Sequence, residues 1–267
     1  MDFKQKYAIE KSYLTPKTKR RPGLMINPCV KFVVAHDTGN PGSTASGNVK
    51  YYENSNNAEN ASAHIFVDDK QIIECIPALT GQPEKAYHVL FNVPTDNQLF
   101  GYNANDTAIG VEYCYGGNID ADEAYRRYIW VIANICNTFN LEPKTSIVGH
   151  FFLDPKRKTD PVTGLANSRR TYEQLLSDIV SEFNDCLSKP KADPTFVEKN
   201  GVARVTVKLN LRKGAPNSTA QIADTVLPGT MLTYAGWVED GQSINGNSKW
   251  FQDPNGNYFW SGGVLAL

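Results

Sequence analysis

The sequence lacks an excess of charge of either sign. Its 27 lysine and arginine residues are balanced by 28 aspartate and glutamate residues. Proteins that bind nucleic acid through its phosphates need a basic surface, and this balance gives no general support for one. The basic cluster KTKRRP at 17–22 is short and is typical of a solvated segment. We therefore expect no nucleic-acid partner.

Long apolar runs are also missing. No stretch approaches the roughly 20 apolar residues that a membrane-spanning helix needs. The N-terminal stretch MDFKQKYAIEKSYL has no apolar run that leads to a small-residue cleavage site, so it does not resemble a signal peptide. We expect no membrane partner and a protein made in the cytoplasm, which would act outside the cell only after release or export by another route.

Cysteine pairs at metal-binding or redox spacing are absent. The chain has five cysteines and no CxxC motif, and an odd number cannot all be paired within one chain. Most lie in apolar stretches such as IIECI and IANIC, where a free cysteine usually serves as a small core residue. We expect reduced, structural cysteines.

The chain has 267 residues, of which 41% are hydrophobic. This length and composition are enough for more than one domain. Short apolar runs at 29–36, 107–115 and 146–150 predict strands, and Asp68-Asp69-Lys70 predicts a hairpin turn between two more. Helical periodicity covers 122–140, with Asp122 near its start as a cap, and 171–183. Strands interleaved with helices predict an α/β domain.

Composition changes at SKPKADP, residues 188–194. Beyond it, the chain has only short β-type runs separated by Gly, Pro and Asn turns, which predict a small all-β domain of barrel size. We therefore divide the chain into a first domain at 1–187, a linker at 188–200 and a β-domain at 201–267.

Two of the four histidines, His36 and His150, end predicted strands, where ligand sites assemble in α/β sheets. With Asp160 they could supply two imidazoles and one carboxylate, and leave a fourth position open, as catalytic zinc requires. A single strand-end histidine is more often a hydrogen-bonded core residue. Spacing alone leaves both interpretations open.

Four motifs, in this order, resemble the zinc-dependent N-acetylmuramoyl-L-alanine amidases of phage endolysins and bacterial autolysins: AHDTGN, SAHIFVDD, GVEYCY and GHFFLDPKRKTDP. The resemblance covers about residues 25–185. It implies a mixed central sheet with flanking helices, the amidase and peptidoglycan-recognition fold. It also implies peptidoglycan as the partner and a zinc ion (Zn2+) that activates water to cleave the bond between N-acetylmuramic acid and L-alanine.

The resemblance assigns roles by position. His36, His150 and Asp160 match the zinc ligands, Lys158 matches the residue that stabilises the oxyanion, and Glu112 matches the general base. The alternative for Lys158 is an ordinary solvated lysine in a basic run. The alternative for Glu112 is a glutamate that faces solvent on an edge strand. A carboxylate within an apolar strand is costly unless it is paired or used, which favours the catalytic role of Glu112.

His64 and His88 are candidates for substrate binding. His64 lies in the SAH strand motif, for which a structural role is the stronger interpretation. His88 lies where related proteins carry an aromatic-histidine pair on a loop that lines the groove, although its neighbours here depart from that pattern.

The stretch from KLNLRK to PGTMLTY resembles bacterial SH3-type domains, which commonly follow catalytic domains in cell-wall hydrolases and bind peptidoglycan. A non-catalytic peptidoglycan-recognition protein on the same fold is the main alternative. The presence of Asp160, Lys158 and Glu112 together favours the enzyme. A third interpretation is a secreted adhesion protein built around the β-domain. Such a protein would need a signal peptide.

Overall fold

The computed structural model describes residues 3–187 and 196–267. The chain divides into two compact units, Met1–Ser188 and Lys189–Leu267. Residues 188–195 of the predicted linker lie outside the described residues. The structure corrects the other end of that linker, because residues 196–200 belong to strand β7 (Phe196–Val205), where Phe196 and Val197 pair with Val238 and Trp237.

The first unit is built on a mixed six-stranded sheet with the order β1-β4-β3-β5-β2-β6. Strands β3, β5, β2 and β6 run parallel, β4 runs antiparallel to β3, and β1 is parallel to β4. The hairpin predicted at Asp68–Lys70 joins β3 to β4. The bounds are β1 Glu10–Lys11, β2 Phe32–Asp37, β3 Ile65–Val67, β4 Ile72–Glu74, β5 Ala108–Tyr113 and β6 Ile147–Gly149.

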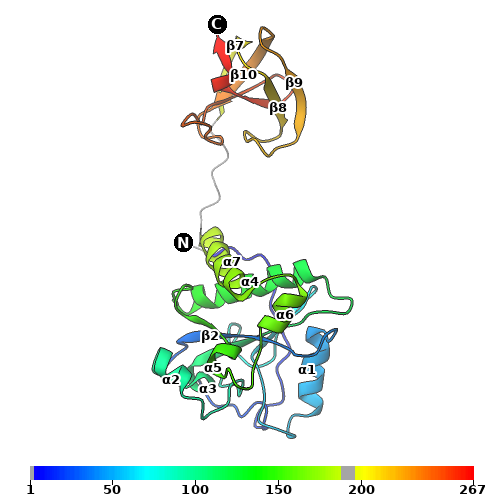
Figure 1. The fold of residues 1–267 in the computed structure, drawn as a ribbon, viewed down its shortest axis with the longest axis vertical. Coiled ribbons are helices and arrows are strands. Elements are labelled where there is room, and N and C mark those ends of the chain that lie inside the picture. The colour runs from blue at the N-terminus through cyan, green and yellow to red at the C-terminus, as the bar shows by residue number, and fades with distance from the viewer. Residues whose placement is uncertain (1–2, 188–195) are drawn as a thin grey trace. The chain divides into compact units, whose positions relative to one another are not determined.

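Helices cover both faces of this sheet, which confirms the α/β prediction (Figure 1). Two long helices, α4 and α7, pack together on one side, where Leu165 of α6 joins the same core, and the short helices α1, α2, α3 and α5 lie on the other side. The bounds are α1 Ala45–Asn54, α2 Thr95–Phe100, α3 Ala104–Thr107, α4 Ala121–Thr138, α5 His150–Leu153, α6 Val162–Asn167 and α7 Tyr172–Leu187.

Both predicted helices form, with one correction at a cap. Helix α4 is capped by Asp120, whose side chain accepts hydrogen bonds from the backbone N–H groups of Asp122 and Glu123. Asp122 lies inside the first turn and pairs with Arg170 instead. The cap lies two residues before the position that the apolar pattern suggested, because a capping residue contributes nothing to the buried face.

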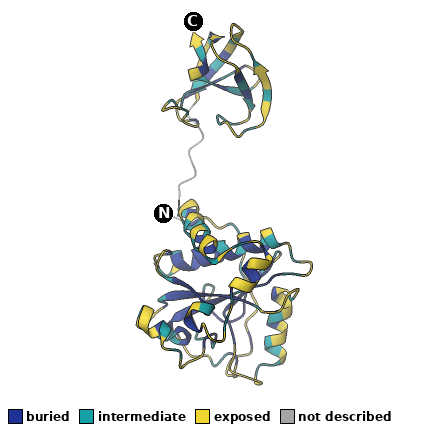
Figure 2. Ribbon diagram, viewed as in Figure 1, coloured by how far each residue is buried: buried dark blue, intermediate teal, exposed yellow. Residues whose placement is uncertain are grey.

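The side chains of β2 alternate between the two faces of the sheet, and this alternation decides on which face His36 lies. Val33 and Ala35 join the main core under α4, whereas Phe32 and Val34 pack on the opposite face in a separate cluster. His36 follows the same alternation and therefore points away from α4. Figure 2 shows the central strands as the buried layer between the helices.

The second unit is an all-antiparallel, seven-stranded sheet with the order β13-β7-β10-β11-β12-β8-β9, which confirms its all-β class. Among the aromatic residues from Trp237 onward, Trp250, Phe251 and Phe259 are buried, whereas Trp237, Tyr258 and Trp260 are partly exposed. The remaining bounds are β8 Leu209–Lys213, β9 Ile222–Val226, β10 Met231–Val238, β11 Trp250–Gln252, β12 Asn257–Trp260, the 3-10 helix η1 Ser261–Gly263 and β13 Val264–Ala266.

All five cysteines are free; four of them are buried, and Cys29 is exposed. Within the described part of the chain, no helix combines the length and apolar character needed to cross a membrane.

Candidate metal centre

His36 is held at the carboxyl end of β2, between β5 and β6. The hydroxyl of Tyr128, on α4, donates a 2.9 Å hydrogen bond to the carbonyl oxygen of His36. This bond ties the backbone of His36 to the helix layer, while the side chain of His36 projects from the other face of the sheet. The strand end therefore presents the imidazole on a rigid support.

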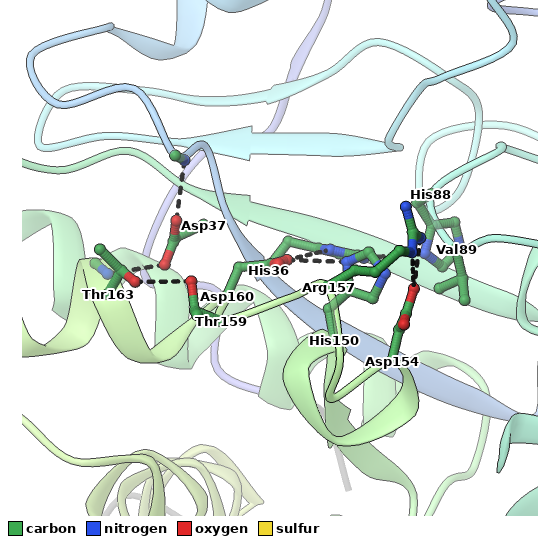
Figure 3. Close-up of polar contacts among 12 residues, drawn as sticks. His36, Asp37, His88, Val89, His150, Asp154, Arg157, Thr159, Asp160 and Thr163 are labelled. Carbon is green, nitrogen blue, oxygen red and sulfur yellow. Dashed lines mark hydrogen bonds and ion pairs between the residues drawn. The ribbon is translucent and has the colours of Figure 1, made fainter. Parts of the chain in front are cut away.

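His150 and Asp160 are brought together by a folded loop. His150 is the first residue of α5, directly after β6, and the N–H of Phe151 donates to the carbonyl oxygen of Asp160 at 2.8 Å. The end of the loop thus returns to its start. In Figure 3, dashed lines join the side chains of His36, His150 and Asp160.

The geometry of these three side chains fits a small metal ion. Asp160 Oδ2 lies 2.9 Å from His36 Nδ1 and 3.0 Å from His150 Nδ1, and the three ligand atoms lie within 4.8 Å of one another. Zinc bonds of about 2.0–2.2 Å in a tetrahedral arrangement would place ligand atoms about 3.3 Å apart. Two imidazoles with one carboxylate are also a donor set that zinc prefers.

Electrostatics favour the protonation states that a metal needs. Burial lowers the pKa of His36 to about 4, although the hydrogen bond to Asp160 opposes this shift. Burial acts to raise the pKa of Asp160, but hydrogen bonds from His150 and His36 outweigh it and hold that pKa well below its ordinary value. A neutral His36 and an ionised Asp160 are the forms that bind metals.

Glu112 lies beside His36 because β5 and β2 are paired in parallel with these two residues in register. The strand is interior, between β3 and β2, so the edge-strand alternative is wrong. Oε2 is buried, and no described residue forms a hydrogen bond with it. Burial, and then the charges of Asp160 and Asp37, raise the pKa of Glu112 well above its ordinary value.

Lys158 lines the same cavity as the three candidate ligands, together with its neighbour Arg157. The N–H groups of both residues donate to the carbonyl oxygen of Asp154, which closes a turn that carries the two basic side chains. The guanidinium of Arg157 also donates from Nε to the Asp154 carboxylate at 2.7 Å. Arg157 was not singled out from the sequence because it lies in an unremarkable run, PKRK.

The structure corrects the substrate contact considered for His64. The ring is fully buried, Nδ1 accepts the N–H of Gly110 at 3.0 Å, and Nε2 lies 2.9 Å from the carbonyl oxygen of Glu84. Both nitrogens are therefore used by the backbone, and no ring atom remains for a ligand. His64 ties β5 to the segment around Glu84.

His88 reaches the site from a loop. Its Nδ1 lies 3.0 Å from Nε2 of His36, and its Nε2 is buried with no hydrogen-bond partner among the described residues. The loop is held by Asn105, whose Oδ1 accepts the N–H groups of His88 and Val89. Nothing in the stretch NANDT marks Asn105 for this task, since its partners are distant in sequence.

The candidate metal centre opens into a groove made of two joined cavities. One, of about 470 Å³, contains His36, Glu112 and Asp160. The other, of about 450 Å³, has Val89, Leu90 and Phe91 in its wall. The residues shared by both are Ala61, Tyr87, His88, His150, Arg157 and Lys158.

The family model described as N-acetylmuramoyl-L-alanine amidase matches residues 27–163. The chain belongs to this family. The matched residues include His36, Glu112, His150, Lys158 and Asp160.

Two curated members of the amidase family come from Bacillus. The N-acetylmuramoyl-L-alanine amidase BlyA of Bacillus subtilis (strain 168) is 35% identical over 169 residues, which cover 60% of this chain and 43% of that protein. A probable N-acetylmuramoyl-L-alanine amidase of Bacillus licheniformis is 35% identical over 197 residues, which cover 70% of this chain and 54% of that protein. The chain thus spans about half the length of the curated relatives it matches.

A solved structure shares the amidase fold. The hydrolase AmiA of Staphylococcus aureus, in complex with its ligand, has a TM-score of 0.54 and 22% sequence identity. The similarity covers 67% of this chain and 84% of that one. The mixed sheet with flanking helices is therefore the fold of this family, as the sequence predicted.

Proposed function

We propose that this protein is a zinc-dependent N-acetylmuramoyl-L-alanine amidase that cleaves the amide bond between N-acetylmuramic acid and L-alanine in peptidoglycan. The observation that carries the proposal is the convergence of His36, His150 and Asp160 in the groove, beside Glu112, whose buried Oε2 has no hydrogen-bond partner among the described residues. Membership of the family supports the same reaction.

His36, His150 and Asp160 would hold the zinc. When bound, zinc polarises a carbonyl group and lowers the pKa of water. Glu112 would accept the proton of the attacking water and pass it to the leaving amine, because its raised pKa makes the carboxylate a stronger base. Lys158 would place positive charge where the amide oxygen becomes negative.

His88 would contact the substrate through Nε2, since that nitrogen has no hydrogen-bond partner among the described residues and His88 lines both cavities. We propose no substrate contact for His64.

The β-unit would bind the cell wall as an SH3-like module. Its partly exposed aromatic residues, Trp237, Tyr258 and Trp260, support this role, because such side chains combine apolar area with a polar tip. Residues 188–195 would then connect the two units. We further propose that the enzyme reaches peptidoglycan after release or export from the cytoplasm.

The decisive experiment compares the wild type with Asp160→Ala on purified sacculi. We expect one zinc per wild-type chain and new L-alanine amino termini, and we expect the variant to lose both. Asp122→Ala is the matched control, because Asp122 is an exposed aspartate on α4 that pairs only with Arg170 among the described residues. Tight binding to sacculi without metal or cleavage would instead identify a non-catalytic recognition protein.

A further inference from the structure

All four histidines of the chain lie in one continuous row. The ring centroids are separated by 4.7 Å between His150 and His36, by 5.2 Å between His36 and His88, and by 5.6 Å between His88 and His64. The row leads from the candidate metal centre into the interior. One direct nitrogen contact links the centre to the inner rings, between His36 Nε2 and His88 Nδ1 at 3.0 Å.

This contact couples the hydrogen positions of the two rings. A neutral imidazole carries one N–H donor and one lone-pair acceptor. A hydrogen bond between two such rings needs the hydrogen on one of the facing nitrogens and a lone pair on the other. If His36 carries its hydrogen on Nε2, His88 must carry its own on Nε2, and if His36 carries it on Nδ1, His88 must carry its own on Nδ1.

On the basis of the proposed function, we propose that His88 is a positioning residue that keeps a hydrogen bond to His36 Nε2 with and without metal, and that its own tautomer reverses when the metal binds. Without metal, His36 Nδ1–H donates to Asp160, and its Nε2 accepts from His88 Nδ1–H. With Nδ1 of His36 occupied by zinc, the hydrogen of His36 lies on Nε2 and donates to His88. The hydrogen of His88 then lies on its own Nε2, so each ring keeps one hydrogen in both states.

The ring of His88 is held in place by contacts that do not involve the metal. Asn105 Oδ1 accepts the N–H of His88 at 2.9 Å, and Asn105 Nδ2 donates to the carbonyl oxygen of Val89 at 2.7 Å. Beneath the ring, a Cβ atom at Gly110 would lie 2.8 Å from His88 Nδ1. Only glycine at this position of β5 allows the imidazole to approach the strand so closely.

The tautomer change alters what the groove offers to a ligand. His88 is one of the residues that line both cavities, and its Nε2 is buried and unpaired among the described residues. In the metal-free state it would be an acceptor, and in the zinc-loaded state it would be a donor. A buried N–H without a partner is costly, so a substrate oxygen that accepts from it would be favoured only once the metal is in place.

Long-range 1H–15N spectra of the histidine rings test this inference on the full chain labelled with 15N-histidine, first metal-free and then with one equivalent of zinc. We expect His88 to change from the Nδ1–H to the Nε2–H form. His64 is the internal control, because its Nδ1 accepts the Gly110 N–H in either state. Zinc binding with no change at His88 would overturn this inference alone, whereas a wild type that binds no zinc would overturn the proposed function as well.

Two substitutions test the positioning role through zinc affinity. His88→Leu removes the acceptor for His36 Nε2–H. Loss of an outer partner of this kind typically weakens metal binding about 10–100-fold, and we expect a loss of zinc affinity of this size. His88→Asn retains a carbonyl oxygen as the acceptor and should restore most of the loss. Zinc dissociation constants come from chelator competition, with circular dichroism to confirm folding. Wild-type affinity in a folded His88→Leu protein would contradict the inference, and the ring spectra of the wild type decide it if that variant does not fold.

Discussion

Glu112 lies on an interior strand, and its buried Oε2 has no hydrogen-bond partner in the part of the chain that the structure describes. Burial of such an oxygen costs free energy unless the group has a use. The β2–β5 register places it next to His36, at the edge of the candidate metal centre. Removal of its basicity should therefore affect the reaction and leave the ligand set intact.

For Glu112→Gln, we expect full zinc content and a loss of hydrolysis of about 10²–10⁴-fold, the usual contribution of a general base. The glutamine preserves the shape of the side chain but cannot accept the proton. Zinc analysis and release of L-alanine amino termini measure the two properties. Glu173→Gln, an exposed substitution on α7, is the control. Activity near that of the wild type in a zinc-loaded Glu112→Gln protein would remove Glu112 from the mechanism.

The acidic limb of the pH profile should depend on Asp37. Glu112 acts as a base only when deprotonated, so kcat/KM should fall as the pH drops through its pKa. The charge of Asp37 helps to raise that pKa. In Asp37→Asn this contribution is lost, the pKa of Glu112 falls, and the acidic limb should move to lower pH. A profile measured on soluble muropeptide that stays fixed or moves to higher pH would refute the assignment.

Sequence motifs pointed to the three candidate ligands that the structure brings together, since His36, His150 and Asp160 lie in short, ordered stretches. They placed His88 on a loop that lines the groove but did not reveal its contact with His36, which forms because Asn105 fixes the loop and Gly110 leaves room beneath the ring. Contacts between loops that are distant in sequence depend on the assembled fold. The same limit explains why a substrate contact was considered for His64, whose backbone partners lie on other segments.

At the scale of single elements, periodicity identified the strands and helices of the first unit better than their ends. The apolar stripe predicted α4, but its cap was placed on Asp122 and lies on Asp120. The predicted linker likewise extended too far, because the polar residues Glu198, Lys199 and Asn200 conceal a strand. Pairing with β10 outweighs their weak strand propensity.

The corrected cap can be tested by stability. Asp120→Ala removes the acceptor for two backbone N–H groups of α4 and should lower the free energy of unfolding by about 1 kcal/mol. Asp122→Ala leaves the cap in place and removes only an exposed ion pair, so its effect should be smaller. Urea denaturation of both variants gives the comparison. A larger loss for Asp122→Ala would restore the cap to the position that the sequence suggested.

At the scale of the whole molecule, each unit has its own hydrophobic core. Phe251 and Phe259 belong to a cluster made entirely of second-unit residues, and every residue of the candidate metal centre lies in the first unit. A catalytic unit joined to a wall-binding unit would gain local concentration on an insoluble polymer and nothing on a small soluble substrate. The two kinds of substrate therefore separate the roles of the units.

We expect a fragment of residues 1–188 to bind zinc and to cleave soluble muropeptide at a rate within a few-fold of the full chain. On sacculi it should be markedly slower, because the proposed wall-binding unit is gone. A fragment of residues 189–267 should sediment with sacculi and cleave nothing. The opposite outcome would be that the 1–188 fragment and the full chain cleave sacculi at equal rates and that the 189–267 fragment stays in the supernatant. That outcome would show that the β-unit does not target the wall. It would leave the amidase assignment of the first unit unchanged.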